Sequence, residues 1–193
     1  TAFPQSIGMG STWNPDLIEE MASITSTEAR IHNNVYGKKL TYWSPTINIL
    51  RDPRWGRTEE SYSEDPYLLS RMATAFVSGI QGDHPKYLKT IATVKHFAAN
   101  NSEFNRHFGS SEVSERFLRE YYLPAFKAAV TESNVYSVIG AYNAVNGVPS
   151  CANEWLLTDV LRKEWGFEGY VVSDCGAISD IVHRHKYETD PEK

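Results

Sequence analysis

The stretch Ile91-Ala92-Thr93-Val94-Lys95-His96-Phe97 begins as a mostly apolar run and carries two basic side chains near its end. A short apolar run of this kind predicts a strand that is covered on both sides, which is typical of a parallel sheet. Functional side chains of parallel sheets collect where the strands end. Lys95 and His96 stand at that position, so we expect this stretch to build both the sheet and a site.

Three further segments around this stretch have the character of strands. Residues 40–50 predict a strand and its exit loop, bounded by Gly37 and by the turn-forming pair Asp52-Pro53. Residues 135–142 and 170–174 are shorter and mostly apolar. Polar residues again follow the apolar part of each segment, namely Tyr142, Asn143, Ser173 and Asp174.

Helical patterns separate these strands. Residues 15–33 carry an apolar stripe with Asn14 as the N-cap, and residues 66–81 carry another that ends at Gly82. Further helices are expected over residues 112–131, 153–165 and 177–185. Pro124 falls inside the first of these three and predicts a kink there.

The alternation of strands and helices predicts an α/β protein with a parallel sheet covered by helices. Two architectures compete, a (β/α)8 TIM barrel and an open doubly wound sheet. A barrel typically needs about 250 residues, and this chain of 193 residues is short by one or two strand–helix units. The chain opens at Thr1 without a starting Met, so we expect it to be part of a longer protein.

Composition excludes some classes of function. Hydrophobic residues make up 41% and charged residues 22% of the chain, as in an ordinary globular protein. The net charge is -5 and basic residues form no block, so nucleic acid is not an expected partner. No apolar run reaches the roughly 18–20 residues that span a bilayer, so no membrane association is expected. Aromatic residues make up 12%; most should be core residues, with sugar stacking as the alternative.

Asp174 lies just beyond the last predicted strand, in Tyr170-Val171-Val172-Ser173-Asp174-Cys175-Gly176. One interpretation is structural: the carboxylate caps the following helix, and Gly176 provides the turn. The other is catalytic: a carboxylate held rigidly at the mouth of a barrel can attack an anomeric carbon and form a glycosyl-enzyme intermediate.

Lys95 and His96 also allow several interpretations. A cation at the end of a buried strand is costly without a partner or an anionic ligand. Neighbouring residues of a regular strand face opposite ways, so both can reach one site only if the strand twists locally. The alternatives are a structural ion pair of Lys95 beside a hydrogen-bonded His96, or a Schiff-base lysine as in an aldolase-like barrel.

Two polar loops complete the candidate residues. The cation-rich segment 51–57 precedes Glu59 and Glu60, so Arg57 can pair with Glu60 or bind vicinal hydroxyls with its fork of donors. Arg106 lies in a second loop near Asn101 and Glu103. The histidines show no zinc-ligand spacing and no glycine-rich phosphate loop is present, so we expect no metal and no cofactor.

Together these segments resemble glycoside hydrolase family 3 over nearly the whole chain, from Phe3 to Ile178. The motifs that carry the resemblance are Phe3-Pro4-Gln5, Trp55-Gly56-Arg57-x-x-Glu60, Glu64-Asp65-Pro66-Tyr67, Lys95-His96-Phe97, Ala141-Tyr142-Asn143 and Val172-Ser173-Asp174. The resemblance implies an α/β fold, with residues 1–193 forming part of the family's N-terminal (β/α)8 barrel. It implies a retaining β-glycosidase acting on oligosaccharides or β-glycosides.

The resemblance also assigns roles to six residues. Asp174 falls on the nucleophile, and Tyr142 on the tyrosine beside it. Arg57, Lys95 and His96 fall on the residues that hydrogen-bond the sugar in subsite -1. Arg106 falls on an arginine at the edge of the site. Cations near Asp174 favour its charged, nucleophilic form.

Two parts of the family's machinery have no match in this chain. The family's first barrel segment supplies an acidic residue that binds the far hydroxyls of the sugar. Its acid/base carboxylate usually comes from a second, α/β-sandwich domain, which we expect as a further part of the full-length protein. None of the remaining carboxylates matches that role, including Glu112, Glu115, Glu132 and Glu168. The resemblance further implies a secreted or periplasmic location.

Within the family the likeness is to the β-xylosidase-like branch. The segments Arg51-Asp52-Pro53-Arg54-Trp55-Gly56-Arg57 and Ser173-Asp174-Cys175-Gly176 both indicate it. Many β-glucosidases of the family carry Trp where this chain has Cys175, and a β-glucosidase remains the alternative, as does an inactive sugar-binding fragment without the acid/base. Cys151 and Cys175 recur in the xylosidase-like pattern, which implies that they could form a disulfide.

Overall fold

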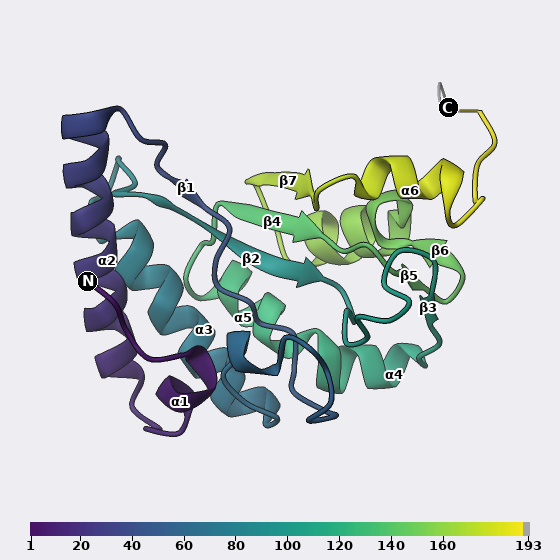
Figure 1. Ribbon diagram of the computed structural model, residues 1–193, viewed down its shortest axis with the longest axis horizontal. Helices are drawn as coiled ribbons and strands as arrows, with labels where there is room; N and C mark the ends of the chain where they lie inside the picture. The colour runs from purple at the N-terminus through teal and green to yellow at the C-terminus, as the bar shows by residue number, and fades with distance from the viewer. Residues whose placement is uncertain (191–193) are drawn as a thin grey trace.

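A four-stranded parallel sheet lies at the centre of the structure, a computed structural model that describes residues 1–190 (Figure 1). Its strands, in spatial order, are β1 (Thr41–Tyr42), β2 (Ile91–Phe97), β4 (Ser137–Gly140) and β7 (Tyr170–Ser173). All three neighbouring pairs are parallel. Spatial order follows chain order without a reversal, as in a barrel; an open doubly wound sheet reverses its order at a switch point.

Three helices pack beside one another and cover the sheet: α2 (Pro15–Tyr36), α3 (Pro66–Gln81) and α5 (Pro124–Thr131) (Figure 1). Between this layer and the sheet, the ring of Phe97 meets Phe126 and Trp165 edge to face, with centroids 5.1 and 5.9 Å apart. Apolar side chains of β2 belong to this core, so the helical side of the sheet is occupied by packing alone.

The first two predicted helices are confirmed by their caps. Asn14 Oδ1 accepts a hydrogen bond from the Leu17 amide at 3.2 Å. Asp65 Oδ1 does the same for the Leu68 amide at 2.7 Å, which satisfies a donor that the helix itself leaves unpaired. The first helix extends three residues beyond the predicted Asn33, to Tyr36, and Gly37 caps its end with a φ of 64°.

The third predicted helix, over residues 112–131, is divided in the structure. It consists of α4 (Glu115–Phe117), the π-helical turn η2 (Leu118–Tyr122) and α5, which Pro124 begins. The proline interrupts the helix as expected, since it has no amide hydrogen to donate. The next helix, η4 (Trp155–Glu164), also has π geometry, and α6 (Ala177–His183) follows β7.

Residues 40–50, predicted as a strand and its exit loop, form a very short strand followed by a long loop. Only Thr41–Tyr42 pairs as β1, and Thr46 then makes an isolated bridge to Lys95. Pro45 lies between them and cannot donate to the sheet, although its carbonyl accepts the Lys95 amide at 3.1 Å. Residues 40–50 therefore still run beside β2, and the loop that follows them begins near the carboxyl end of β2.

Short elements gather near the carboxyl ends of the sheet (Figure 1). A small second sheet contains β3 (Ser110–Ser111) and the hairpin of β5 (Ala144–Val145) with β6 (Val148–Pro149). The remaining elements are α1 (Ser6–Gly10), η1 (Thr58–Glu60) and η3 (Ser150–Ala152). Among residues 1–190, the helices all fall short of the length and apolar character that crossing a bilayer requires.

Candidate active site

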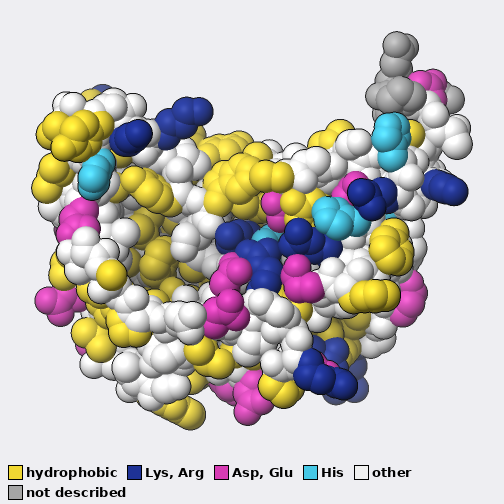
Figure 2. Space-filling model, viewed as in Figure 1, with side chains coloured by type: hydrophobic (Ala, Val, Ile, Leu, Met, Phe, Trp, Pro, Cys, Tyr) yellow, Lys and Arg dark blue, Asp and Glu magenta, His cyan; other side chains and the backbone are white. Residues whose placement is uncertain are grey.

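The carboxyl ends of three strands and one loop bring five side chains together. Lys95 and His96 lie at the end of β2, Tyr142 lies two residues beyond β4, and Asp174 directly follows β7. Arg57 comes from the loop that precedes η1. Figure 2 shows basic and acidic side chains gathered near the middle of this face of the molecule. The predicted convergence at the ends of the strands is thus present.

Each oxygen of the Asp174 carboxylate has a close neighbour. Oδ1 accepts the Cys175 amide at 2.7 Å, and Oδ2 lies 3.4 Å from Nε2 of His96. The Tyr142 hydroxyl lies close enough to the same carboxylate to feel its negative charge. The N-cap of α6 is Gly176, and no side chain caps that helix. The structural interpretation of Asp174 as a helix cap is therefore wrong.

His96 is fixed by Asn48, which sequence reasoning missed. Asn48 Oδ1 accepts both the His96 amide at 2.8 Å and Nδ1–H of the ring at 2.9 Å. The other ring nitrogen accepts a hydrogen bond from Nη1 of Arg57 at 2.7 Å. Burial, together with the charges of Arg57, Lys95 and Arg106, lowers the pKa of His96 to about 2. The ring is therefore neutral, and its approach to Asp174 is not an ion pair.

Arg57 forms the expected pair with Glu60. Its Nε and Nη2 donate to the two carboxylate oxygens at 2.7 and 2.5 Å, and Thr46 Oγ1 donates to Glu60 at 3.0 Å. Burial opposes the charge on Arg57, but the hydrogen bonds and charge of Glu60, with Glu103 and Asp174, outweigh it and raise its pKa. The pair therefore aims a charged guanidinium at the ring of His96.

Lys95 reaches the same site because β2 is irregular there. The register with β4 shifts between Val94 and Phe97. The expected local distortion is thus present. Burial lowers the pKa of Lys95, and repulsion from Arg57 lowers it further, while the charges of Glu60 and Asp174 act in the opposite direction. Its ammonium group thus lies within electrostatic reach of the carboxylate.

Tyr142 and Arg106 form one edge of the site. The Arg106 guanidinium lies over the Tyr142 ring, 4.8 Å from its centroid, which is a cation–π distance. Glu103 accepts from Arg106 Nη1 at 3.0 Å and from Trp55 Nε1 at 3.3 Å. Burial, followed by the negative charge and hydrogen bond of Asp174, raises the pKa of Tyr142 to about 12. The phenol therefore remains protonated.

The disulfide implied by the family resemblance is not formed, since Cys151 and Cys175 are both free thiols. The Cys151 thiol faces β4, where it lies 3.6 Å from the carbonyl oxygen of Ala141. A Cβ added at Gly140 would come within 2.8 Å of its sulfur. Cys175 is exposed. Burial, then the charge of Asp174, raises the pKa of Cys151 to about 11, so this thiol stays protonated.

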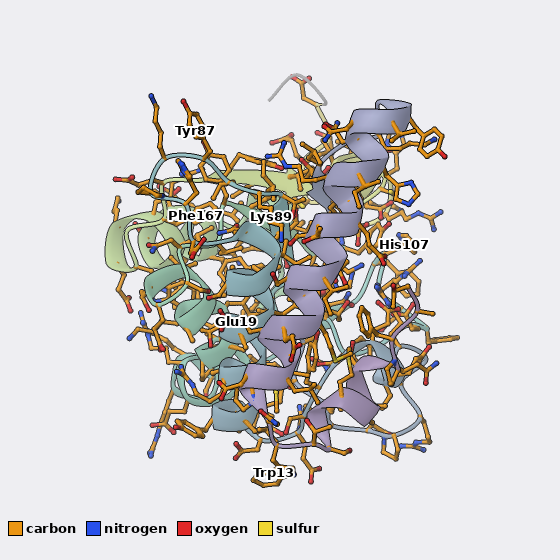
Figure 3. All side chains as sticks on the ribbon, turned by 90° about the vertical axis from the view of Figure 1, so that its left-hand side faces the viewer. Trp13, Glu19, Tyr87, Lys89, His107 and Phe167 are labelled. Carbon is orange, nitrogen blue, oxygen red and sulfur yellow. The ribbon has the colours of Figure 1, made fainter. Side chains whose placement is uncertain are left out.

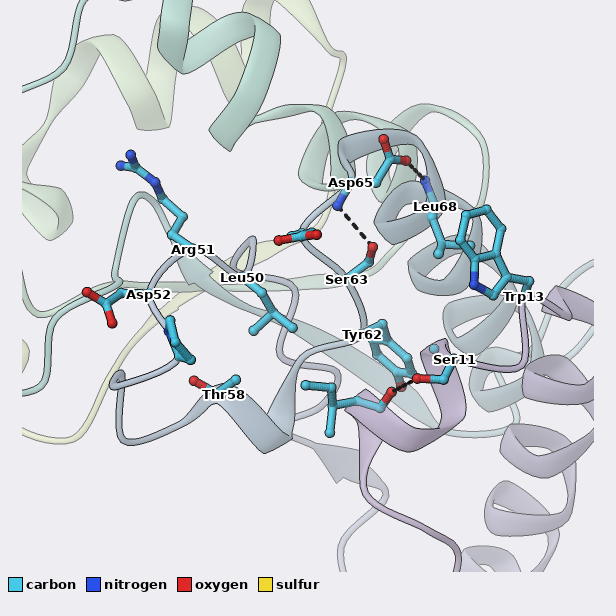
Figure 4. Close-up of a pocket in the computed structure, with 14 residues that line it drawn as sticks. Ser11, Trp13, Leu50, Arg51, Asp52, Thr58, Tyr62, Ser63, Asp65 and Leu68 are labelled. Carbon is cyan, nitrogen blue, oxygen red and sulfur yellow. Dashed lines mark hydrogen bonds between the residues drawn. The ribbon is translucent and has the colours of Figure 1, made fainter.

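A separate cleft of about 540 Å³ lies between α1 and the segments around residues 50–53 and 62–68 (Figure 4). Arg51, Asp52 and Ser63 line it, together with Trp13. Ser63 Oγ accepts the Asp65 amide at 3.0 Å. None of the five converging side chains lines this cleft, so the candidate site is the open face around Asp174. Across residues 1–190, no group of three or more His, Cys, Asp or Glu residues could hold a metal ion.

The fold and site together define an α/β barrel domain with one carboxylate among basic side chains at the strand ends. A family model for the glycosyl hydrolase family 3 N terminal domain matches residues 1–192. This chain belongs to that family, and its fold is the TIM-barrel-like fold of that domain.

Named relatives cover the whole chain. It is 44% identical over 200 residues to an exo-1,4-beta-xylosidase, bxlB, of Emericella nidulans, and these are 100% of this chain and 26% of the relative. It is 42% identical over 203 residues to a xylan 1,4-beta-xylosidase of Xylanibacter ruminicola, covering 98% of this chain and 24% of the relative. The chain thus spans about a quarter of the length of these relatives.

Solved structures are similar to the same extent. The exo-beta-xylosidase XlnD, in complex with a xylobiose aziridine activity-based probe, superposes with a TM-score of 0.96 at 38% identity, over 98% of this chain and 26% of that one. Beta-glucosidase 3B from Thermotoga neapolitana, in complex with alpha-D-glucose, gives a TM-score of 0.81 at 46% identity, over 90% and 23%.

Proposed function

We propose that this chain is the nucleophile-bearing part of a retaining exo-β-glycosidase that removes terminal β-linked sugars from oligosaccharides or glycosides, in the manner of a β-xylosidase. The observation that carries the proposal is the placement of the Asp174 carboxylate, which accepts the Cys175 amide and lies beside Lys95, Arg57 and a neutral His96. The names of its relatives support the same reaction.

Asp174 is proposed to attack the anomeric carbon, forming a bond to the sugar while the glycosidic bond breaks. The retaining mechanism uses this covalent intermediate, which water then hydrolyses. Rigid placement favours the attack, because it removes orientational freedom before the reaction. Asn48 and Glu60 contribute to that rigidity by fixing His96 and Arg57.

Arg57, Lys95 and His96 are proposed to bind the hydroxyl groups of the same sugar. Lys95 and Arg57 are donors only, whereas the neutral His96 ring offers Nε2 as an acceptor. A sugar hydroxyl that donates to this nitrogen would release the Arg57 Nη1 hydrogen for another oxygen of the sugar. Arg106, over Tyr142, is placed to contact the sugar at the edge of the site.

The acid/base carboxylate is proposed to come from a second, α/β-sandwich domain of the full-length protein. A retaining enzyme needs two carboxyl groups roughly 5–5.5 Å apart. The nearest acidic side chains of this chain already serve its cations, since Glu60 pairs with Arg57 and Glu103 with Arg106. A group from outside these 193 residues fits the role better.

A β-glucosidase is the second candidate, because solved β-glucosidases share 36–46% identity with this chain. Xylose lacks the hydroxymethyl group of glucose, so a pocket that accepts one sugar discriminates against the other by shape. Cys175, in the position where many β-glucosidases carry Trp, favours the xylosidase. Comparing kcat/KM on aryl β-xyloside and aryl β-glucoside separates the two.

Labelling with a mechanism-based 2-fluoro-xyloside tests the proposal in the full-length protein. We expect one sugar adduct on the peptide that contains Asp174, and none in Asp174→Ala. Asp159→Ala, which removes an exposed carboxylate at an unrelated helix, should label like the wild type. An adduct on another carboxylate would refute the assignment, and a borohydride-trapped carbonyl adduct on Lys95 would indicate Schiff-base chemistry instead.

A further inference from the structure

His107 and Asp180 form a pair outside the five converging side chains. Nδ1 of His107 lies 2.6 Å from Oδ2 of Asp180, which joins the loop after β2 to α6, 73 positions further along the chain. Figure 3 shows the labelled His107 on the opposite side of the molecule from Phe167, which packs in the helical core. The pair therefore belongs to the face that carries the site.

The hydrogen bonds of His107 determine which ring nitrogen carries the proton. Arg106 Nε donates to His107 Nε2 at 3.3 Å, so that nitrogen is the acceptor. The proton of a neutral ring must then lie on Nδ1, where it is donated to Asp180. Without the Asp180 carboxylate, only the long 3.3 Å contact from Arg106 favours the proton on Nδ1, and the Nε2–H form cannot accept from Arg106. Asp180 thereby controls a contact that it does not itself make.

Tyr142 receives support from this same assembly. The His107 ring packs edge-on against the Tyr142 ring with centroids 4.5 Å apart. The Arg106 guanidinium lies 4.8 Å from the Tyr142 centroid, and His185 Nε2 donates to the Tyr142 carbonyl at 2.8 Å. The hydroxyl at the far end of that tyrosine lies within electrostatic reach of Asp174. A continuous path of interactions thus runs from Asp180 to the proposed nucleophile.

The Asp180 side chain is buried, and each of its carboxylate oxygens has a partner. Its exposed fraction is 7%, and its second oxygen forms an ion pair with Arg184, whose Nε lies 3.1 Å away. A buried carboxylate is costly unless hydrogen bonds compensate, and here both oxygens are compensated. The position of the His107 ring is therefore set from α6, the element that directly follows the Asp174 loop.

We propose that Asp180 and His107 are positioning residues, which fix Arg106 and Tyr142 beside Asp174. This inference rests on the proposed glycosidase function. Neither residue reaches the reacting atoms; Asp180 acts by selecting the tautomer of His107, and His107 acts by anchoring the guanidinium and the phenol ring. The reaction gains from this because a small displacement of a group next to the nucleophile lowers its rate strongly.

Kinetics of the full-length protein on an aryl β-xyloside test the inference, with active sites counted by 2-fluoro-xyloside labelling. We expect Asp180→Ala and His107→Phe each to lower kcat/KM per labelled site by roughly 10- to 100-fold. The double variant should lose no more than the worse single variant, because both changes break the same path. Asp180→Asn retains an acceptor oxygen for Nδ1–H and should recover most of the loss.

Each alternative has its own outcome. Losses below about twofold per labelled site, losses that multiply in the double variant, or no recovery in Asp180→Asn would each overturn the inference. A loss explained wholly by fewer labelled sites would show a folding role only and would also overturn it. Asp159→Ala, an exposed charge deletion of the same kind, should match the wild type.

Nitrogen NMR of the His107 ring separates this inference from the proposed function. We expect the Nδ1–H tautomer in the wild type and in Asp180→Asn, and its loss in Asp180→Ala. An Nε2–H tautomer in the wild type would overturn the inference whatever the activity. A wild-type protein that is neither active nor labelled, yet shows Nδ1–H, would refute the glycosidase function and the catalytic part of the inference, leaving only the hydrogen-bonded pair.

Discussion

Two sets of arginine–glutamate contacts in this chain use the same chemistry in different surroundings. Arg57 pairs with Glu60 at 2.5 Å, and the two side chains are 16% and 36% exposed. Arg119 pairs with Glu115 and Glu164, each at 2.8 Å, and its side chain is 36% exposed, theirs 63% and 42%. The contact distances are similar, but in the first set Arg57 also contacts the buried His96 and Glu60 also accepts a hydrogen bond from the buried Thr46.

The difference shows that surroundings, and not contact distance, decide what an ion pair does. An exposed pair contributes about 0–1 kcal/mol, because water competes for both partners. The Arg57 guanidinium is only 16% exposed and also contacts the buried His96, so removal of Glu60 would leave its charge poorly compensated. The Arg57–Glu60 pair, here called the inner set, can therefore fix the position of side chains in the candidate site. Arg119 with Glu115 and Glu164, the outer set, lies on the surface of the helices.

The largest expected effect comes from removing the Asp174 carboxylate, which lies at the centre of the candidate site near the inner set. Asp174→Ala in the full-length protein should lower kcat on an aryl β-xyloside by roughly 10⁴-fold or more, because no other group forms the bond to the sugar. Asp159→Ala, from an exposed pair with Lys163, should retain the wild-type rate. Substantial turnover of Asp174→Ala without an added nucleophile would contradict the assignment.

Assaying the 193 residues alone asks whether any carboxylate of this chain can act as the acid. We expect almost no hydrolysis of xylobiose, since general acid assistance is typically worth about 10²–10⁴-fold. An activated aryl xyloside should give a small burst of the aryl alcohol and then a very low steady rate. Steady hydrolysis of xylobiose at ordinary enzyme rates would show that the second carboxylate lies within these residues.

The neighbours of Asp174 should show an intermediate effect. Lys95→Ala and His96→Ala should each reduce the stabilisation of the transition state by a few kcal/mol. A loss of about 2.7 kcal/mol corresponds to a 10²-fold lower kcat/KM. These two side chains donate to or accept from hydroxyl groups and form no bond to carbon, so labelling of Asp174 should persist at a reduced rate. Wild-type kcat/KM in either variant would remove that residue from the sugar site.

Acid should reveal the burial of His96. The pKa of His96 is about 2 in the folded chain and near 6.5 in the unfolded chain. Below about pH 6.5 the unfolded chain therefore binds a proton on this ring that the folded chain does not bind. Stability is therefore fully present above pH 6.5 and falls toward pH 2, by up to about 1.4 kcal/mol per pH unit. The urea midpoint of His96→Gln should depend less on pH, with His183→Gln as the exposed control. Equal slopes would contradict the neutral ring.

The smallest effect is expected in the outer set. Arg119→Ala removes contacts to Glu115 and Glu164 and should change the free energy of unfolding by less than about 1 kcal/mol, with kcat/KM unchanged. Glu60→Gln, which breaks the inner pair, is the matched comparison and should lower kcat/KM. If both variants lost the same activity, burial would not be what distinguishes the two sets.

Sequence reasoning succeeded where local chemistry determines structure. Asn14 caps its helix as predicted, because a side-chain acceptor before an apolar stripe has few other uses; Asp65 caps the next helix in the same way, although no cap was predicted there. The strand Ile91–Phe97 has the predicted bounds. The grouping of basic residues with Asp174 followed from a general property of parallel sheets, whose strand ends share one edge.

Other features depended on contacts between distant segments. Asn48 is a single amide within an apolar run, and nothing local indicates that it holds His96, 48 residues away. The π geometry of η4 is not readable from a helical pattern. The β5–β6 hairpin did have a signal that was missed, since Asn146-Gly147 between apolar residues is typical of a two-residue turn with positive φ, here 50° and 83°.

The sequential strand order also bears on how the chain folds while it is being made. Each strand of the main sheet pairs with the one that precedes it in that sheet, so no strand must wait for a partner synthesised much later. Every pairing closes a loop no longer than one crossover unit, which keeps the entropic cost of each addition modest. A nascent chain leaving the ribosome can therefore extend this sheet strand by strand, with Asp174 placed only when β7 docks beside β4.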